Sequence, residues 1–146
     1  GEVIELGDGV RLEVVHPGPM LVEDNRNENS VAMRLVYGDF TFLFTGDAEQ
    51  AGEAEMLAAG RPLTALVFKA GHHGSNSSSS MPMLQAVQPQ IVIVSSGIDN
   101  RFGHPAPEML ERATAVGAVT LRTDELGTIR VTTDGKTMAW QADPPR

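Results

Sequence analysis

Hydrophobic and polar residues alternate along the first third of the chain in a pattern that predicts two β-hairpins. Residues 2–6 and 10–15 alternate apolar and polar side chains on either side of Gly7-Asp8-Gly9, whose residues tolerate positive φ. Residues 31–37 and 40–45 repeat this arrangement across a second short turn. The run 40–45 is apolar almost throughout, so we expect this strand in the centre of a sheet.

Farther along the chain, helical and strand patterns alternate, which is typical of an α/β protein. The predicted helices span 48–59, 82–87 and 107–116, and the predicted strands span 65–68, 91–94 and 119–122, followed by a hairpin of 127–133 and 136–140. No repeat or linker interrupts the pattern, so we predict that residues 1–146 form a single domain with a frayed end at 143–146. The predicted fold is a mixed sheet with helices on one face and an antiparallel N-terminal edge.

Composition restricts the chemistry that this domain can perform. The 146 residues include no cysteine, so a metal ion would be held by His, Asp, Glu or water, which suits zinc or manganese. The formal net charge of −8 argues against a broad basic surface for nucleic acid, although a bound cation can reverse the local sign of an acidic site. The aromatic residues are few and lie in apolar surroundings, so they do not indicate a base-stacking platform.

Metal-capable side chains follow two of the buried strands. Asp47 comes after the strand 40–45 and a glycine, where it is either a metal ligand or the N-cap of the next helix. His72 and His73 follow the strand 65–68 and are flanked by glycines, which let a ligand approach the backbone. From the residues alone, two interpretations are equally supported. Either this pair binds a metal ion, or the two residues are surface histidines of a loop.

Other polar groups near these positions have simpler interpretations. His104 precedes a helix and, taken alone, predicts no special role. The run 77–80 consists of serines without a nucleophile elbow, which favours a solvated loop. Glu49, Glu53 and Glu55 indicate a solvated helix face.

Four motifs in this order resemble the ComEC family of competence proteins, whose last domain has a metallo-β-lactamase fold. The motifs are Asn29-Ser30, Phe44-Thr45-Gly46-Asp47, Lys69-Ala70-Gly71-His72-His73-Gly74-Ser75 and Asn100-Arg101-Phe102-Gly103-His104-Pro105. The similarity covers about Val10 to Ile129 and implies the C-terminal half of an αββα fold.

The resemblance also implies a set of roles for these residues. Asp47 would bridge two divalent metals, zinc or manganese, and His73 would complete one metal site, although His72 and His73 could exchange roles. His72 would face the substrate phosphate, and His104 would stabilise the phosphate or protonate the leaving group. Ser75 and Asn29 are the candidates for substrate binding. The implied reaction is hydrolysis of the strand of incoming DNA that is not imported.

The chain departs from the family at one point, because no His-x-His-x-Asp-His motif occurs in it. We therefore expect weak or absent metal binding by the chain alone, and association with the N-terminal half of the domain or with a second copy. The implied partners of the parent protein are single-stranded DNA and a transmembrane channel, with this domain on the extracytoplasmic side of a bacterial membrane. The alternatives are a non-catalytic docking or self-association module and a related enzyme acting on a small phosphodiester or ester.

Overall fold

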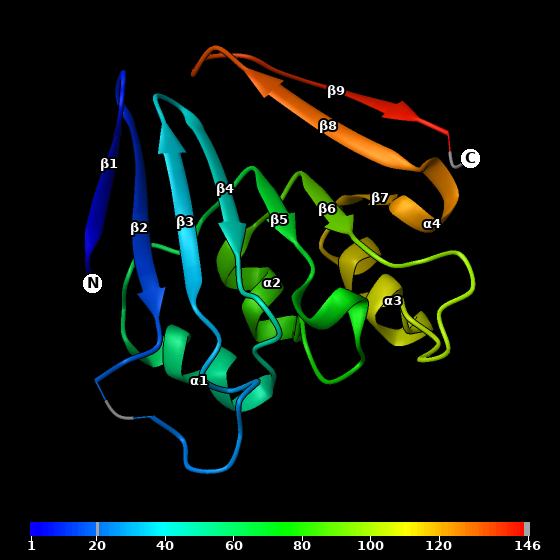
Figure 1. The fold of residues 1–146 in the computed structure, drawn as a ribbon, viewed down its shortest axis with the longest axis horizontal. Coiled ribbons are helices and arrows are strands. Elements are labelled where there is room, and N and C mark those ends of the chain that lie inside the picture. Colours follow the sequence, from blue (N-terminus) through cyan, green and yellow to red (C-terminus); the bar gives the residue numbers. More distant parts are fainter. Residues whose placement is uncertain (20, 145–146) are drawn as a thin grey trace.

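A computed structural model describes residues 1–19 and 21–144 and shows a seven-stranded sheet as the centre of the fold (Figure 1). The strands lie in chain order: β1 (Val3–Gly7), β2 (Val10–His16), β3 (Ala32–Tyr37), β4 (Phe40–Phe44), β5 (Val67–Lys69), β6 (Ile91–Val94) and β7 (Val119–Arg122). Strands β1 to β4 pair antiparallel, and β4 to β7 pair parallel. The predicted α/β class, the mixed sheet and the antiparallel N-terminal edge are therefore confirmed.

The sequence pattern explains where each strand lies. The apolar strand β4 is the fourth of the seven, and it joins the antiparallel half of the sheet to the parallel half. All four side chains of β6 are buried, as expected for a parallel strand covered on both faces. The edge strand β1 is exposed along its whole length.

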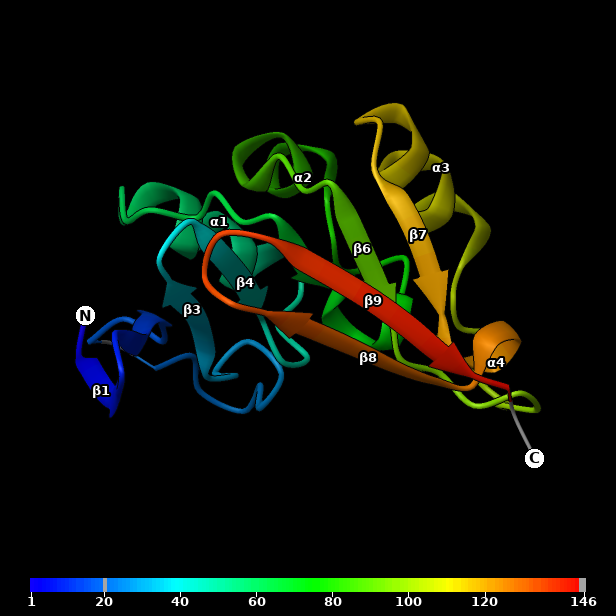
Figure 2. The same ribbon diagram turned by 90° about the horizontal axis from the view of Figure 1, so that it is seen from above.

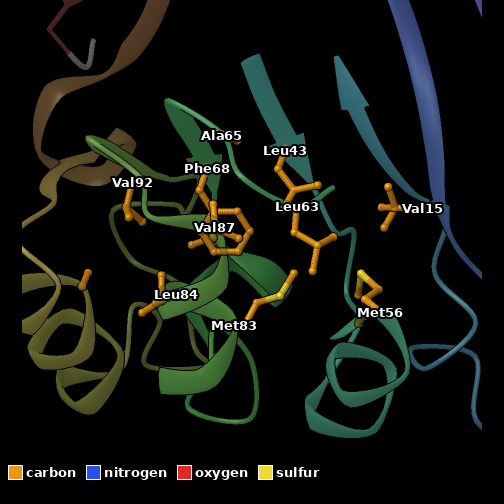
Figure 3. Packing of buried hydrophobic residues seen from close by; sticks show 14 of the residues in the cluster. Val15, Leu43, Met56, Leu63, Ala65, Phe68, Met83, Leu84, Val87 and Val92 are labelled. Atoms are coloured by element: carbon orange, nitrogen blue, oxygen red, sulfur yellow. The ribbon is translucent and has the colours of Figure 1, made fainter. Parts of the chain in front are cut away.

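Three helices, α1 (Gln50–Ala58), α2 (Met81–Val87) and α3 (Pro107–Ala115), lie on one face of the sheet, as predicted (Figure 2). The main hydrophobic core lies between this face and the helices, where Phe68 and Leu43 from the strands meet Met56 and Met83 from α1 and α2 (Figure 3). Helix α1 begins two residues later than predicted, and its N-cap is Glu49. The interpretation of Asp47 as the N-cap is therefore wrong.

The C-terminal hairpin covers part of the opposite face of the sheet. Strands β8 (Thr128–Thr133) and β9 (Met138–Asp143) form a separate two-stranded sheet, preceded by the short helix α4 (Thr123–Leu126) that the sequence did not predict (Figure 2). Ile129, Val131 and Met138 pack against a second, smaller core that includes Phe40 and Val67. A cavity of 530 Å³ remains between the hairpin and the sheet.

The ends of the chain differ from the expectation in one respect. Asp143 belongs to β9, so it is not part of a frayed end, whereas Pro145 and Arg146 lie outside the described residues. None of the helices in the described ranges is long and apolar enough to cross a bilayer.

Candidate metal and phosphate site

The candidate site lies where the neighbouring parallel strands β4 and β5 end. Phe44 pairs with Lys69 in the register, so the residues after both strands emerge at the same edge of the sheet. Asp47 follows β4, and His72 and His73 lie in the 3₁₀ turn η1 (Gly71–Gly74) after β5. This placement brings the Oδ1 atom of Asp47 within 3.8 Å of the Nε2 atom of His73.

The turn that carries the two histidines has an uncommon backbone conformation. His72 and His73 have φ values of 45° and 56°, in the left-handed region that costs residues other than glycine about 1–3 kcal/mol. Hydrogen bonds hold the turn in place: the His72 amide donates to the Gly46 carbonyl at 3.0 Å, and the Gly71 amide donates to Ser79 Oγ at 3.1 Å. Strained backbone of this kind is concentrated at functional sites.

The serine-rich loop that supports this turn buries its two central serines and half-buries Ser77 and Ser80, so the prediction of a solvated loop is wrong. Ser78 and Ser79 are fully buried, as is Glu53 of α1. The Glu53 carboxylate accepts hydrogen bonds from the amides of Ser79 at 2.5 Å and Ser80 at 2.9 Å, and burial raises its pKa. Arg112 of α3 donates to the carbonyls of Ser78 and Ser79, both at 3.0 Å. The interpretation of Glu53 as part of a solvated helix face is therefore also wrong.

Hydrogen bonds orient both imidazoles of the turn. His73 Nδ1 lies 2.8 Å from the Ser95 carbonyl, which can only accept, so Nδ1 donates this hydrogen bond and Nε2 is the ring atom that faces Asp47. His72 Nδ1 lies 3.1 Å from a carboxylate oxygen of Glu49, so by the same reasoning Nδ1 donates a hydrogen bond to the carboxylate. An orienting hydrogen bond of this kind is typical of metal-ligating histidines.

His104 joins the same cluster from the loop between β6 and α3. Its ring centroid lies 5.8 Å from that of His72, and its Nδ1 atom is buried without a hydrogen-bond partner. Burial lowers the pKa of His104, and the neighbouring His72 and His73 lower it further. A neutral imidazole therefore faces the cluster at neutral pH.

The titration of His104 gives a direct check of this geometry. In the metal-free chain, we expect an imidazole pKa below 6.5, measured by NMR, and a higher value in a His72→Ala variant, where one of the nearby imidazoles is missing. Since the folded chain binds this proton less tightly than the unfolded chain, the free energy of unfolding should decrease as the pH falls below 6.5. A Lys136→Ala change in the distant hairpin should leave the pKa unchanged. A pKa above 6.5, or one that is insensitive to His72→Ala, contradicts the arrangement.

Lys69 is a member of the site that sequence reasoning did not single out. Its ammonium group donates to the Ala70 carbonyl at 3.0 Å. Burial lowers the pKa of Lys69, while the carboxylate of Asp47 raises it, so the two side chains are electrostatic neighbours. The position of Lys69 at the end of β5, directly before the histidine motif, was the available signal.

The two residues predicted to bind substrate make hydrogen bonds within their own loops. The Asn29 side chain exchanges hydrogen bonds with the backbone of Val22, both at 2.8 Å. Ser75 is 9% exposed, and its Oγ atom lies 2.9 Å from that of Ser77. Their part in substrate binding stays a prediction.

The donor set around Asp47 fits part of a metal site. Two ligand atoms about 2.1 Å from one zinc ion lie at most about 4.2 Å apart. The Asp47–His73 separation of 3.8 Å meets this limit. Among residues 1–19 and 21–144, however, no group of three or more His, Cys, Asp or Glu side chains is placed to hold an ion. Among the described residues, Asp47 and His73 therefore offer two candidate ligands, fewer than a metal site needs.

The fold and the site together define an α/β domain with acid and imidazole groups converging at the ends of two parallel strands. A scan against protein-family models gives no match. The chain is 32% identical over 153 aligned positions to ComE operon protein 3 of Bacillus subtilis, which covers 94% of the chain and 20% of that protein. It is 38% identical over 124 positions to competence protein ComA of Neisseria gonorrhoeae, covering 84% of the chain and 18% of the relative.

Recombination protein 2 of Haemophilus influenzae is 31% identical over 124 positions, which are 84% of the chain and 15% of that relative. The chain is thus a domain of the ComEC family of competence proteins. It spans about one fifth or less of the length of these relatives.

Proposed function

We propose that the chain is the C-terminal half of a metallo-β-lactamase-fold domain that hydrolyses phosphodiester bonds during DNA uptake. The observation that carries this proposal is the 3.8 Å separation of Asp47 Oδ1 from His73 Nε2, at the ends of adjacent parallel strands. The relationship to competence proteins supports a role in DNA uptake. In this proposal the substrate is the DNA strand that is not imported.

Each side chain of the cluster has a distinct task in this proposal. Asp47 and His73 hold a divalent metal, zinc or manganese, which when bound polarises a phosphoryl oxygen and helps to generate the nucleophile. His72 is held by Glu49, which leaves its Nε2 atom free to contact the phosphate. His104 is neutral in the free chain, and the negative charge of a bound phosphate would favour its protonated form, which can protonate the leaving oxygen.

The remaining ligands of the two-metal site come, in this proposal, from the N-terminal half of the same domain. The parent protein would carry this domain on the extracytoplasmic side of a bacterial membrane, next to the transmembrane channel through which one DNA strand passes. The net charge of −8 fits a localised metal-dependent site better than a basic DNA-binding surface.

The test uses a longer protein that includes the segment upstream of Gly1. With manganese or zinc, this protein should cleave single-stranded DNA, and a His73→Ala change should lower the rate by at least about a hundredfold, since removing even an outer partner of a ligand costs about 10–100-fold. Calorimetry should show weaker manganese binding by the same variant. Glu111→Ala, an exposed change on α3, is the control and should cleave at the wild-type rate.

The second candidate is a non-catalytic docking or self-association module. The observation that favours it is the exposed edge strand β1, where Val3, Ile4 and Leu6 are 53%, 39% and 56% exposed. Undiminished cleavage by the His73→Ala variant would contradict the enzymatic proposal and favour this one.

A further inference from the structure

Phe102 is an exposed aromatic side chain at the edge of the candidate site, so the expectation that the aromatic residues lie in apolar surroundings is wrong for this residue. The other four phenylalanines of the chain lie on β4 or β5, whereas Phe102 lies in the loop between β6 and α3 and is 69% exposed. Its ring borders a pocket of 450 Å³ that is also lined by His73, His104 and residues 95–97. This volume is within the range of roughly 300–1,000 Å³ that is typical of ligand pockets.

The ring of Phe102 has a defined orientation relative to the histidines. It stacks on His104 with centroids 6.0 Å apart and an angle of 19° between the planes. The guanidinium carbon of Arg101 lies 5.1 Å from the same ring centroid. Because 69% of the residue stays exposed in spite of these neighbours, a ligand can reach the side chain from solvent.

Most polar groups of the pocket wall already have partners within the protein. The Asn100 side chain accepts from the His104 amide at 2.9 Å and donates to the carbonyls of Gly97 and His104. Ser96 Oγ donates to Asp124 at 3.2 Å. These bonds fix the shape of the loop and leave aromatic and imidazole surfaces as the main contacts. Such a wall suits stacking against a nucleobase, which does not depend on the identity of the base. It offers few free polar groups for hydrogen bonds to the edge of one particular base.

Arg101 supplies the positive charge that a phosphate backbone requires. Its side chain is exposed and adjoins the pocket through Phe102, in a chain whose formal net charge is −8. In so acidic a protein, attraction of a phosphate by side chains must come from local cations such as this one.

We propose that Phe102 and Arg101 form a platform for single-stranded nucleic acid beside the histidine cluster. One base stacks on the ring of Phe102, and Arg101 neutralises an adjacent phosphate, so that the next phosphodiester lies toward His73 and His104. This inference rests on the proposed function, because it takes the substrate strand as the ligand. It identifies the residues that bind the strand, and it predicts that binding does not depend on the identity of the base.

Binding of short oligonucleotides to the 146-residue chain tests the platform without cleavage. Fluorescence anisotropy in the presence of EDTA should give an affinity for oligothymidylate that falls about tenfold in Phe102→Ala, because this variant loses the stacking of one base. Phe102→Tyr should keep the wild-type affinity. An abasic oligomer of the same length should bind Phe102→Ala and the wild-type chain equally. Ile98→Ala, which removes an exposed apolar side chain from the same segment, is the matched control and should change neither affinity.

Arg101→Gln should give a different signature. It should weaken binding of the abasic and the base-bearing oligomer alike, and lower the slope of log Kd against log salt by about 0.7, the value for one phosphate contact on a single strand. Equal affinities of the wild-type chain and Phe102→Ala for oligothymidylate, or no binding by the wild-type chain, would overturn the platform. A change in sedimentation of Phe102→Ala without a change in oligomer affinity would also overturn it, in favour of a contact between copies of the chain.

These outcomes are independent of the test of the enzymatic proposal. If the binding measurements contradict the platform, the effect of His73→Ala on metal-dependent cleavage by the longer protein still tests the enzymatic proposal. Conversely, if the longer protein does not cleave DNA, oligonucleotide binding by the 146-residue chain in EDTA still tests the platform.

Discussion

Replacing Glu53 by alanine should lower the free energy of unfolding by about 2–4 kcal/mol, although the substitution lies in a helix rich in alanine and glutamate. The Glu53 carboxylate is the acceptor for the buried amide of Ser79 and the partly buried amide of Ser80. Each buried donor left without a partner costs about 1–3 kcal/mol. Urea denaturation at neutral pH, with both proteins showing the same m-value, measures the difference.

Two further variants separate the hydrogen bonds from a general effect of removing a carboxylate. Glu53→Gln keeps one acceptor oxygen and should lose about half as much stability as Glu53→Ala. Glu111→Ala removes an exposed carboxylate on α3 and should change stability by less than about 0.5 kcal/mol. If Glu53→Ala and Glu111→Ala were equally stable, the serine amides would have found other partners.

The loss of Glu53 should also reach the candidate site. Ser79 accepts the hydrogen bond of the Gly71 amide through its Oγ atom, and Gly71 begins the turn that holds His72 and His73. A displaced serine loop therefore removes one of the bonds that maintain the left-handed backbone of the histidines. Changed NMR shifts of both imidazoles in Glu53→Ala, and not in Glu111→Ala, would show this connection.

Much of the sheet and the place of the site followed from local patterns. The apolar run of β4 predicted its central position, and the alternation of helices with β5 to β7 predicted parallel pairing. Because neighbouring parallel strands end at one edge of a sheet, residues after β4 and β5 had to lie near each other. The approach of Asp47 to His73 is a consequence of that rule.

The buried polar contacts could not be predicted in this way. The bonds of Glu53 and Arg112 to the serine loop join residues 26 to 34 positions apart, and no local pattern reveals such pairs. His16 is buried, with its Nε2 atom 2.7 Å from the Glu28 carbonyl, twelve positions along the chain. Glu28, which stands among polar residues in the sequence, is buried and accepts a hydrogen bond from the Gly52 amide of α1. Polar residues that fold into the interior through distant partners are indistinguishable, in sequence, from polar residues on the surface.

Gly74→Ala is the second change for which we expect a large effect, a loss of about 3 kcal/mol in the free energy of unfolding. Gly74 has a φ of +86° and lies at the end of the histidine turn, against the loop of His104. A Cβ atom there would lie 2.9 Å from the Cβ of Pro105 and 3.1 Å from side-chain atoms of Met109 and Val94. These neighbours are buried, so the added methyl group cannot be accommodated without moving the turn or α3.

Gly103→Ala is the matched control, because Gly103 has a similar φ of +69° but no atom within 4 Å of the added Cβ. It should lose only the cost of a left-handed backbone, about 1–2 kcal/mol. The difference between the two variants in urea denaturation therefore isolates the packing contact between the histidine turn and the His104 loop. Equal losses would mean that the two segments adjust freely to each other. A larger loss in Gly74→Ala, together with shifted resonances of His73, would mean that the packing of β6 and α3 on Gly74 keeps His73 within reach of Asp47.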